Sequence, residues 1–236
     1  KMIDLDVPVA DYWPEFGCEG KEEATIRHVL LHQAGIPAPH LYRQIFFWPS
    51  WKQVIRSLAR TPAQFPPGSK TAYHLVNYGF ILGEVIRRVS GDSVDFYLEK
   101  HFFKPMGLKN IWLRIPTREL KRSPRVFAAD SEMRGTAALF NIPLIRRALI
   151  PAAGLHGSAQ DLATFFQMLL SGGSYLGQEY IRPETIKMAA QSHYDGYDEY
   201  IKGNMNWGLG FIMGGSKHKS VDVNQQALGY RSSSST

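Results

Sequence analysis

The chain has 236 residues, which allows one large domain or two small ones, and its 44% hydrophobic content is enough to bury a core, so wholesale disorder is excluded. Lys and Arg number 27 against 21 Asp and Glu, a net charge of +6, and the short, scattered basic clusters favour a solvated basic surface over nucleic-acid binding. No run approaches the roughly 18 apolar residues of a membrane span, and the single Cys18 excludes an internal disulfide or a cysteine-based metal site.

Helices dominate the predicted elements. Apolar residues recur with the 3.6-residue period, bounded by caps such as Thr25 and stops such as Gly91. Ser158 and Asp161 form a capping-box-like start for one of these helices. The predicted helices, in chain order, are Ala24–Leu31, Trp51–Ala59, Leu75–Val89, Val94–Phe103, Leu162–Leu170 and one that starts at Arg182. Only Asn110–Ile115 and Trp207–Met213 have the character of strands, so the predicted sheet is underpopulated for a chain of this length.

The common local signatures of catalysis are nearly absent. No Gly-x-Ser-x-Gly, His-Glu-x-x-His, Gly-x-Gly-x-x-Gly or Walker loop occurs in the sequence. One Ser-x-x-Lys pattern, Ser216 to Lys219, lies in a glycine-led polar stretch without helical periodicity. The pattern needs a helical turn to bring the lysine amine beside the serine hydroxyl, so a hairpin loop is the preferred interpretation.

Longer segments carry a resemblance. Taken together and in order, they resemble the serine β-lactamase and penicillin-binding-protein superfamily, in particular the branch of class C β-lactamases and their esterase relatives. The resemblance covers nearly the whole chain, and it rests on the segments Leu5–Phe16, Ile26–Pro37, Pro67–Gly91, Phe103–Leu108, Ile150–Ala163 and Trp207–Phe211. It implies a β-lactamase/transpeptidase-like α+β fold with a helical subdomain.

The resemblance also implies that residues 1–236 form a single incomplete domain, truncated at both ends, with an incomplete antiparallel sheet. In this family a catalytic serine and lysine sit at a helix start upstream of the segment that begins at Leu5. A Lys-Thr-Gly or His-x-Gly strand follows the point that corresponds to Thr236. Only the middle one of the three family motifs is then expected within the chain.

That middle motif reads Tyr73-His74-Leu75, where many members have Tyr-x-Asn. By resemblance Tyr73 is the general acid/base that works with the serine and lysine. A neighbouring lysine ammonium favours the phenolate and brings a pKa of about 10 toward working range. Without the resemblance, a core tyrosine is the simpler interpretation. Leu75 offers no amide to a β-lactam side chain, which favours ester substrates over antibiotics.

Several histidines are weighed as site residues. His74 and His156 are candidate substrate-binding residues; the alternatives are a solvated ring at the helix start for His74 and a backbone-bonded loop residue for His156. His28 and His32, four residues apart, suit a two-ligand clip, but half-exposed helix residues are preferred because no third ligand is near. No metal and no cofactor is expected.

The sequence therefore predicts part of a serine hydrolase, a carboxylesterase-like protein that acts on a small-molecule ester or amide through an acyl-serine intermediate. Residues 1–236 themselves are expected to lack the nucleophilic serine. The alternative is an inactive pseudo-hydrolase whose scaffold serves binding or assembly. No nucleic-acid partner and no membrane-spanning segment are expected.

Overall fold

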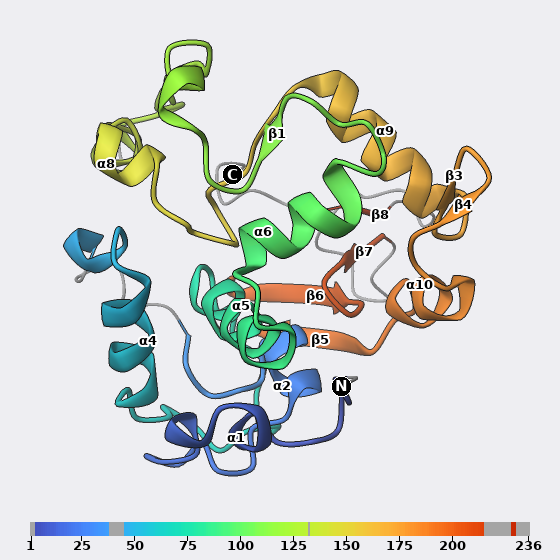
Figure 1. Ribbon diagram of the computed structural model, residues 1–236. Coiled ribbons are helices and arrows are strands. Elements are labelled where there is room, and N and C mark those ends of the chain that lie inside the picture. The colour runs from blue at the N-terminus through green and yellow to red at the C-terminus, as the bar shows by residue number, and fades with distance from the viewer. Residues whose placement is uncertain (1–2, 38–44, 132, 215–227, 230–236) are drawn as a thin grey trace.

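The computed structural model describes residues 3–37, 45–131, 133–214 and 228–229 of the protein (Figure 1). Nine α-helices are found within these ranges: α1 Val9–Tyr12, α2 Ile26–Leu30, α4 Trp51–Ala59, α5 Asn77–Ser90, α6 Val94–Leu98, α7 Arg134–Phe140, α8 Pro143–Arg146, α9 Ala159–Leu170 and α10 Pro183–Ala189. Short turns of 3-10 helix lie at Pro14–Phe16, Ile45–Phe47 and Thr117–Glu119, and a π-helical turn, Glu99–Phe103, continues α6.

The strands of the described residues are short and antiparallel. They are β1 Ile111–Trp112, β2 His156–Gly157, β3 Ser174–Tyr175, β4 Gln178–Glu179, β5 Tyr194–Asp198, β6 Gly203–Trp207, β7 Ile212–Met213 and β8 Leu228–Gly229. The strands β5-β6-β7-β8 form one four-stranded sheet, while β1 pairs with β2 and β3 pairs with β4. The mixture of helices and small antiparallel sheets confirms the α+β class.

Helix α5 is the central helix of the main core. It contacts α1, α2, α4 and α6, and Figure 1 shows it beside the β5–β6 hairpin. Phe80, Ile81 and Val85 give it a buried apolar stripe, as the 3.6-residue period requires. The helix ends at Gly91, whose φ of 82° lets its N–H return to the carbonyl of Arg87. The predicted stop is confirmed.

Two predicted helix starts are also confirmed. Thr25 caps α2: its hydroxyl accepts from the N–H of His28 at 3.1 Å, and the ring of His28 accepts from the N–H of Thr25 at 3.2 Å, which completes a capping box. Ser158 caps α9 by accepting from the N–H of Asp161. The carboxylate of Asp161 then accepts from the N–H of Asn110, and this bond ties α9 to the segment before β1.

The predicted strand Trp207–Met213 is wrong. Trp207 ends β6 and Ile212 begins β7, and the residues between them form a turn in which Gly210 has a φ of 82°. Glycine adopts this conformation without the steric penalty of a Cβ atom, so the chain reverses where an uninterrupted strand was expected. The predicted strand Asn110–Ile115 is reduced to Ile111–Trp112, and β5 was not predicted at all.

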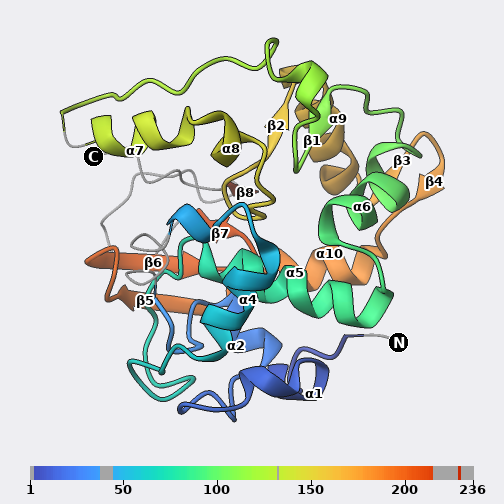
Figure 2. The same cartoon turned by 60° about the vertical axis from the view of Figure 1, so that its left-hand side comes forward.

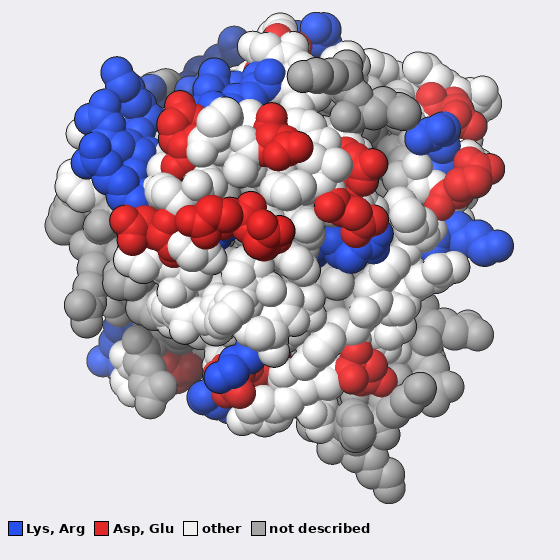
Figure 3. Space-filling model, turned by 90° about the horizontal axis from the view of Figure 1, so that it is seen from below, with Lys and Arg blue, Asp and Glu red and all other residues white. Residues whose placement is uncertain are grey.

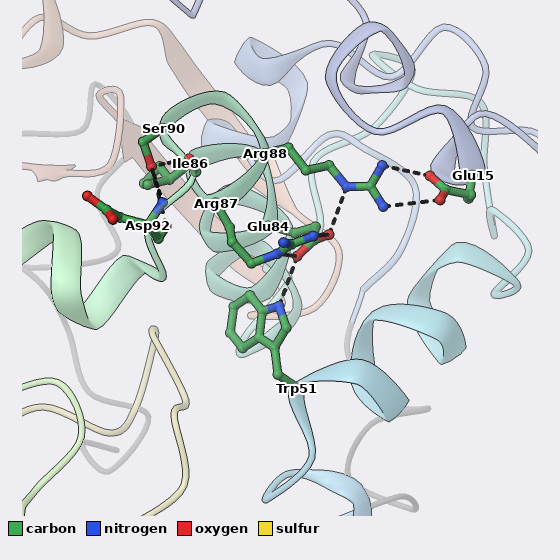
Figure 4. Close-up of polar contacts among 8 residues, drawn as sticks. All are labelled: Glu15, Trp51, Glu84, Ile86, Arg87, Arg88, Ser90 and Asp92. Carbon is green, nitrogen blue, oxygen red and sulfur yellow. Dashed lines mark hydrogen bonds and ion pairs between the residues drawn. The ribbon is translucent and has the colours of Figure 1, made fainter.

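A buried carboxylate joins three parts of the helical region (Figure 4). Glu84 of α5 accepts from the indole of Trp51 at 2.8 Å, from Arg87 at 2.7 and 2.8 Å, and from Arg88 at 2.8 Å. Arg88 also pairs with Glu15 at 2.8 Å. Burial alone would raise the pKa of Glu84, but the hydrogen bonds from the two arginines and the indole outweigh it and hold the pKa below the usual value. The network links α4, α5 and the turn at Pro14–Phe16.

A buried lysine donates hydrogen bonds at the C-terminal end of α4. Lys21 has no exposed surface, and its ammonium donates to the carbonyl oxygens of Cys18, Ala59 and Thr61 at 2.7, 3.2 and 2.6 Å. The last carbonyls of a helix have no partner within the helix and carry partial negative charge, so a cation suits this position. Desolvation lowers the pKa of Lys21.

Charge is unevenly distributed along the chain and over the surface. Residues 104–147 contain ten Lys and Arg against three Asp and Glu, whereas the rest of the chain has 17 against 18. Basic residues occur along the whole chain, as expected, but outside this segment acidic residues balance them. At the other extreme, seven carboxylates between Asp4 and Glu23 are all exposed, and acidic side chains form a band across the face seen from the α1 side (Figure 3). The excess of positive charge belongs to one segment.

Candidate active site around Tyr73

Tyr73 lies on the segment that leads into α5, in a small core between this segment and the β5–β6 hairpin. Its side chain is 7% exposed and packs with Leu31, Leu75, Met205, Trp207 and Leu209. The phenol ring stacks on Trp207 with 5.6 Å between centroids and 14° between planes, and the ring of His32 meets it edge-on at 4.7 Å. Two aromatic neighbours thus fix the plane of the Tyr73 ring.

The backbone of Tyr73 is held from across the chain. Its N–H donates to Oδ1 of Asp198 at 3.1 Å, and the same oxygen accepts from the N–H groups of Tyr200 and Ile201 at 2.9 Å each. Asp198 is fully buried, and Oδ2 accepts no hydrogen bond within the part of the chain that the structure describes. The N–H of Glu199 donates to the carbonyl of Thr71, so the hairpin and the tyrosine segment are joined at several points.

Two buried histidines support the same segment in their neutral forms. His32 accepts from Ala72 N–H with its carbonyl at 3.0 Å and from His74 N–H with Nδ1 at 3.2 Å. His74 Nε2 accepts from Ile36 N–H at 3.3 Å, which leaves Nδ1 to donate to the Ala72 carbonyl at 2.5 Å. Desolvation lowers the pKa of His74 to about 4, and desolvation with the neighbouring His74 lowers that of His32 well below 6.5.

Leu75 adopts a backbone conformation that is unusual for its residue type. Its φ is 47°, in the left-handed region where asparagine is more easily accommodated than a branched apolar residue. Its side chain is 7% exposed and belongs to the Tyr73 cluster. Because Leu75 cannot continue a right-handed helix, α5 begins at Asn77, two residues later than predicted.

His156 lies elsewhere, on β2. It lines a cavity of about 390 Å³ whose lining does not include Tyr73. Its Nε2 is 3.3 Å from the carbonyl of Arg146, so Nε2 carries the proton and Nδ1 accepts from the hydroxyl of Ser123 at 2.8 Å. Partial burial lowers the pKa of His156.

Tyr73 and His74 are neighbours in sequence and both are buried, whereas His156 lines a cavity whose lining includes neither of them. The expectation of a solvated His74 ring is wrong, because the ring has no exposed surface and both its nitrogens bond to backbone. His32 was expected to be a half-exposed helix residue, but it is buried, with a φ of 58°, just beyond α2. The half-exposed position expected for His28 is confirmed.

Sequence reasoning missed the two residues that hold the tyrosine segment. Asp198 is 125 residues from Tyr73, and no local pattern marks it. His32 was noted only as one half of a histidine pair; its place between Leu31 and Gly35, where the short helix stops, was the available signal. Trp207, the first residue of the predicted strand Trp207–Met213, stacks on Tyr73.

The residues that the structure describes show neither a metal-binding cluster nor a membrane-spanning helix. They contain no group of three His, Cys, Asp or Glu side chains that could hold a metal ion. None of their helices is long and apolar enough to cross a membrane. The Ser216 to Lys219 pattern lies outside the described residues.

Comparison with known proteins gives a consistent result. Residues 1–232 match the family model Beta-lactamase. A solved penicillin-binding-protein homolog from Caulobacter crescentus is 30% identical with a TM-score of 0.79, and the match covers 97% of this chain and 65% of that one. A solved family VIII carboxylesterase is 30% identical with a TM-score of 0.83, covering 97% of this chain and 64% of that one.

A curated relative from Escherichia coli K12, named "Putative D-alanyl-D-alanine carboxypeptidase", is 27% identical over 89% of this chain and 53% of its own length. The chain therefore spans about half the length of the curated relatives that it matches. The model match covers nearly the whole chain, and the fold agrees with the solved neighbours. The chain belongs to the Beta-lactamase family, within the serine β-lactamase and penicillin-binding-protein superfamily of serine hydrolases.

Proposed function

We propose that residues 1–236 are the middle part of a carboxylesterase-like serine hydrolase in which Tyr73 is the general acid/base. The observation that carries the proposal is the fixed position of Tyr73: its ring is stacked on Trp207, and its backbone N–H is bound by the buried Asp198. General acid/base catalysis needs a proton carrier held in one geometry, and this arrangement supplies it.

In the proposed reaction a serine hydroxyl attacks an ester or amide carbonyl and forms an acyl-enzyme. Tyr73, as phenolate, takes the hydroxyl proton and returns it to the leaving group; a water molecule then releases the acyl group by the same route. We place the serine and its lysine partner on polypeptide outside residues 1–236. The limited coverage of the relatives' length, 53% for the Escherichia coli protein, supports this placement.

The proposed substrates are small esters rather than β-lactams. The left-handed conformation at position 75 is occupied by leucine, whose side chain packs in the Tyr73 cluster and has no hydrogen-bonding group. The match to a family VIII carboxylesterase at 30% identity supports the same preference.

The test measures p-nitrophenyl ester hydrolysis and fluorophosphonate labelling in protein that carries the flanking polypeptide. Tyr73→Phe is expected to lower kcat by roughly 100-fold or more, because general acid/base catalysis contributes on the order of 10²–10⁴. Tyr12→Phe is the matched control, since within the described part of the chain its hydroxyl accepts a single hydrogen bond, from the exposed N–H of Asp4. Residues 1–236 alone are expected to show no serine-reagent-sensitive turnover.

Equal activity of Tyr73→Phe and Tyr12→Phe would remove Tyr73 from the mechanism. Turnover by residues 1–236 alone would show that the nucleophile lies within them. A folded protein with intact flanks and no fluorophosphonate labelling would favour the pseudo-hydrolase, in which the same scaffold serves binding or assembly.

A further inference from the structure

The cavity beside His156 is lined by neither Tyr73 nor any other residue of the Tyr73 cluster. It forms where α8, the segment after β1, and β2 come together, a region that Figure 2 shows at the top of the molecule. Its volume is about 390 Å³, which falls within the range of small-molecule sites, roughly 300–1,000 Å³. Apolar floor residues such as Ile115, Ile145 and Ile150 are combined with a polar rim.

The rim of this cavity is strongly basic. Arg122, Arg125 and Arg146 line it, and Glu119 is the single carboxylate among its lining residues. All four lie in the segment 104–147, which holds the positive excess of the whole chain. A cavity with low-dielectric walls focuses the field of such charges on its interior and raises the local concentration of anions.

The three guanidinium groups differ in how they are engaged. Arg122 pairs with Glu119 at 2.7 Å, and it donates to the side chain of Asn110 at 3.1 Å. Arg146 donates to the carbonyl oxygens of Ser123 and Pro124 at 2.7 and 3.1 Å, so its charge meets no carboxylate among the described residues.

Arg125 is exposed and makes no hydrogen bond or ion pair with the part of the chain that the structure describes. Two positive charges at the rim thus have no anionic partner within that part of the chain.

The histidine on the wall adds a fixed polar surface. With Nε2–H donating to the Arg146 carbonyl and Nδ1 accepting from Ser123, His156 is neutral and holds the carbonyl that lies next to the rim. Ser123 connects both groups, since its carbonyl accepts from Arg146 while its hydroxyl bonds to the ring. This closed set of bonds keeps the wall in place without adding negative charge.

We infer that this cavity binds a small organic anion, through a carboxylate or phosphate group held by Arg125 and Arg146. Guanidinium groups bind both kinds of oxyanion in a bidentate manner, and such bonds are about twice as strong as neutral ones. The volume suits a metabolite-sized molecule. The proposed site contains no residue of the Tyr73 cluster.

Isothermal titration calorimetry at low ionic strength, with glutarate and inorganic phosphate as probes, tests the inference. At least one anion is expected to bind saturably, and Arg125→Gln is expected to weaken it roughly five- to tenfold by removing one charge-assisted contact. Glutaramide, the neutral diamide, is expected not to bind. Arg182→Gln is the matched control: it makes the same change of charge at an exposed position outside the cavity.

The two probes separate the sources of the anion: binding of glutarate alone assigns a carboxylate ligand, and binding of phosphate alone assigns a phosphate ligand. Arg125→Lys, which keeps the charge, is expected to retain more affinity than Arg125→Gln. Absence of saturable binding by both probes would overturn the inference. An equal loss of affinity in Arg182→Gln and Arg125→Gln would also overturn it, because the effect would then follow net charge alone.

Discussion

The buried carboxylate of Glu84 provides the sharpest test of what holds the helical region together. Glu84→Gln keeps the shape of the side chain but replaces one acceptor oxygen by an NH₂ donor. The wild-type carboxylate accepts hydrogen bonds from Trp51, Arg87 and Arg88, and its side chain is only 1% exposed. In the variant, at least one guanidinium N–H faces another donor in a buried position.

The magnitude follows from the number and exposure of the partners. A hydrogen bond to a charged group contributes roughly 1.5–3 kcal/mol. The amide oxygen keeps part of the set, and the arginine side chains, 43% and 24% exposed, regain water when released. We therefore expect a loss of about 2–3 kcal/mol in the free energy of unfolding, or a decrease in Tm of roughly 4–12 °C for a chain of this size.

The assay is urea unfolding followed by tryptophan fluorescence, with Glu15→Gln as the matched control. Glu15 pairs with the same Arg88, but its side chain is 64% exposed, so its loss is expected to cost less than about 0.5 kcal/mol. The folded pKa of Glu84 is depressed below 4.5, so its contribution is present above pH 4.5 and disappears as the pH falls through the folded pKa. The difference in the free energy of unfolding between wild type and Glu84→Gln should therefore become smaller as the pH falls below 4.5.

A Glu84→Gln variant no less stable than Glu15→Gln would refute the reasoning. A difference in the free energy of unfolding between wild type and Glu84→Gln that stays constant from pH 7 to well below pH 4.5 would also refute it, because the stabilisation would then not come from the ionised carboxylate.

Two further predictions concern buried basic groups. Lys21→Met should lower the free energy of unfolding by about 2–3 kcal/mol, because three carbonyl oxygens lose their donor. Lys52→Met, on the exposed side of α4, is the control and should change the free energy of unfolding little. Thermal unfolding of the two variants tests this prediction. His74, with a folded pKa of about 4 against 6.5 when unfolded, contributes stability that is complete above pH 6.5 and declines by roughly 3 kcal/mol as the pH falls to 4. His74→Gln should flatten that decline in urea titrations, and an unchanged pH slope would count against a neutral, buried His74.

The helices could be predicted because their information is local. The stripe of Phe80, Ile81 and Val85, the stop at Gly91 and the cap at Ser158 all lie within or beside the helices that they define. The sheet could not be predicted in the same way. Strand β5 contains Gly196 and carries no alternation of apolar residues, and it exists because β6 pairs with it residue by residue.

In the candidate site, too, the local sequence predicts one part, and contacts between residues far apart in the chain determine the rest. A motif identified Tyr73, since its neighbours in sequence carry the resemblance, but the residues that fix it come from other parts of the chain. Asp198 stands in a polar stretch that is typical of a loop, and His32 owes its importance to contacts with Tyr73, His74 and Trp207 that no spacing encodes. His74 was wrongly placed in solvent because burial of a neutral imidazole depends on backbone groups that arrive from Ile36 and Ala72.

The bond between Tyr73 and Asp198 has a consequence for the order of events during synthesis. The two residues are 125 positions apart, and ribosomes add about 5–20 residues per second, so roughly 6–25 s separate the appearance of the first from that of the second. During this interval the tyrosine segment lacks the carboxylate that receives its N–H and the indole that covers its ring. Assembly of this site must therefore be a late step of folding, completed only after the β5–β6 hairpin has left the ribosome.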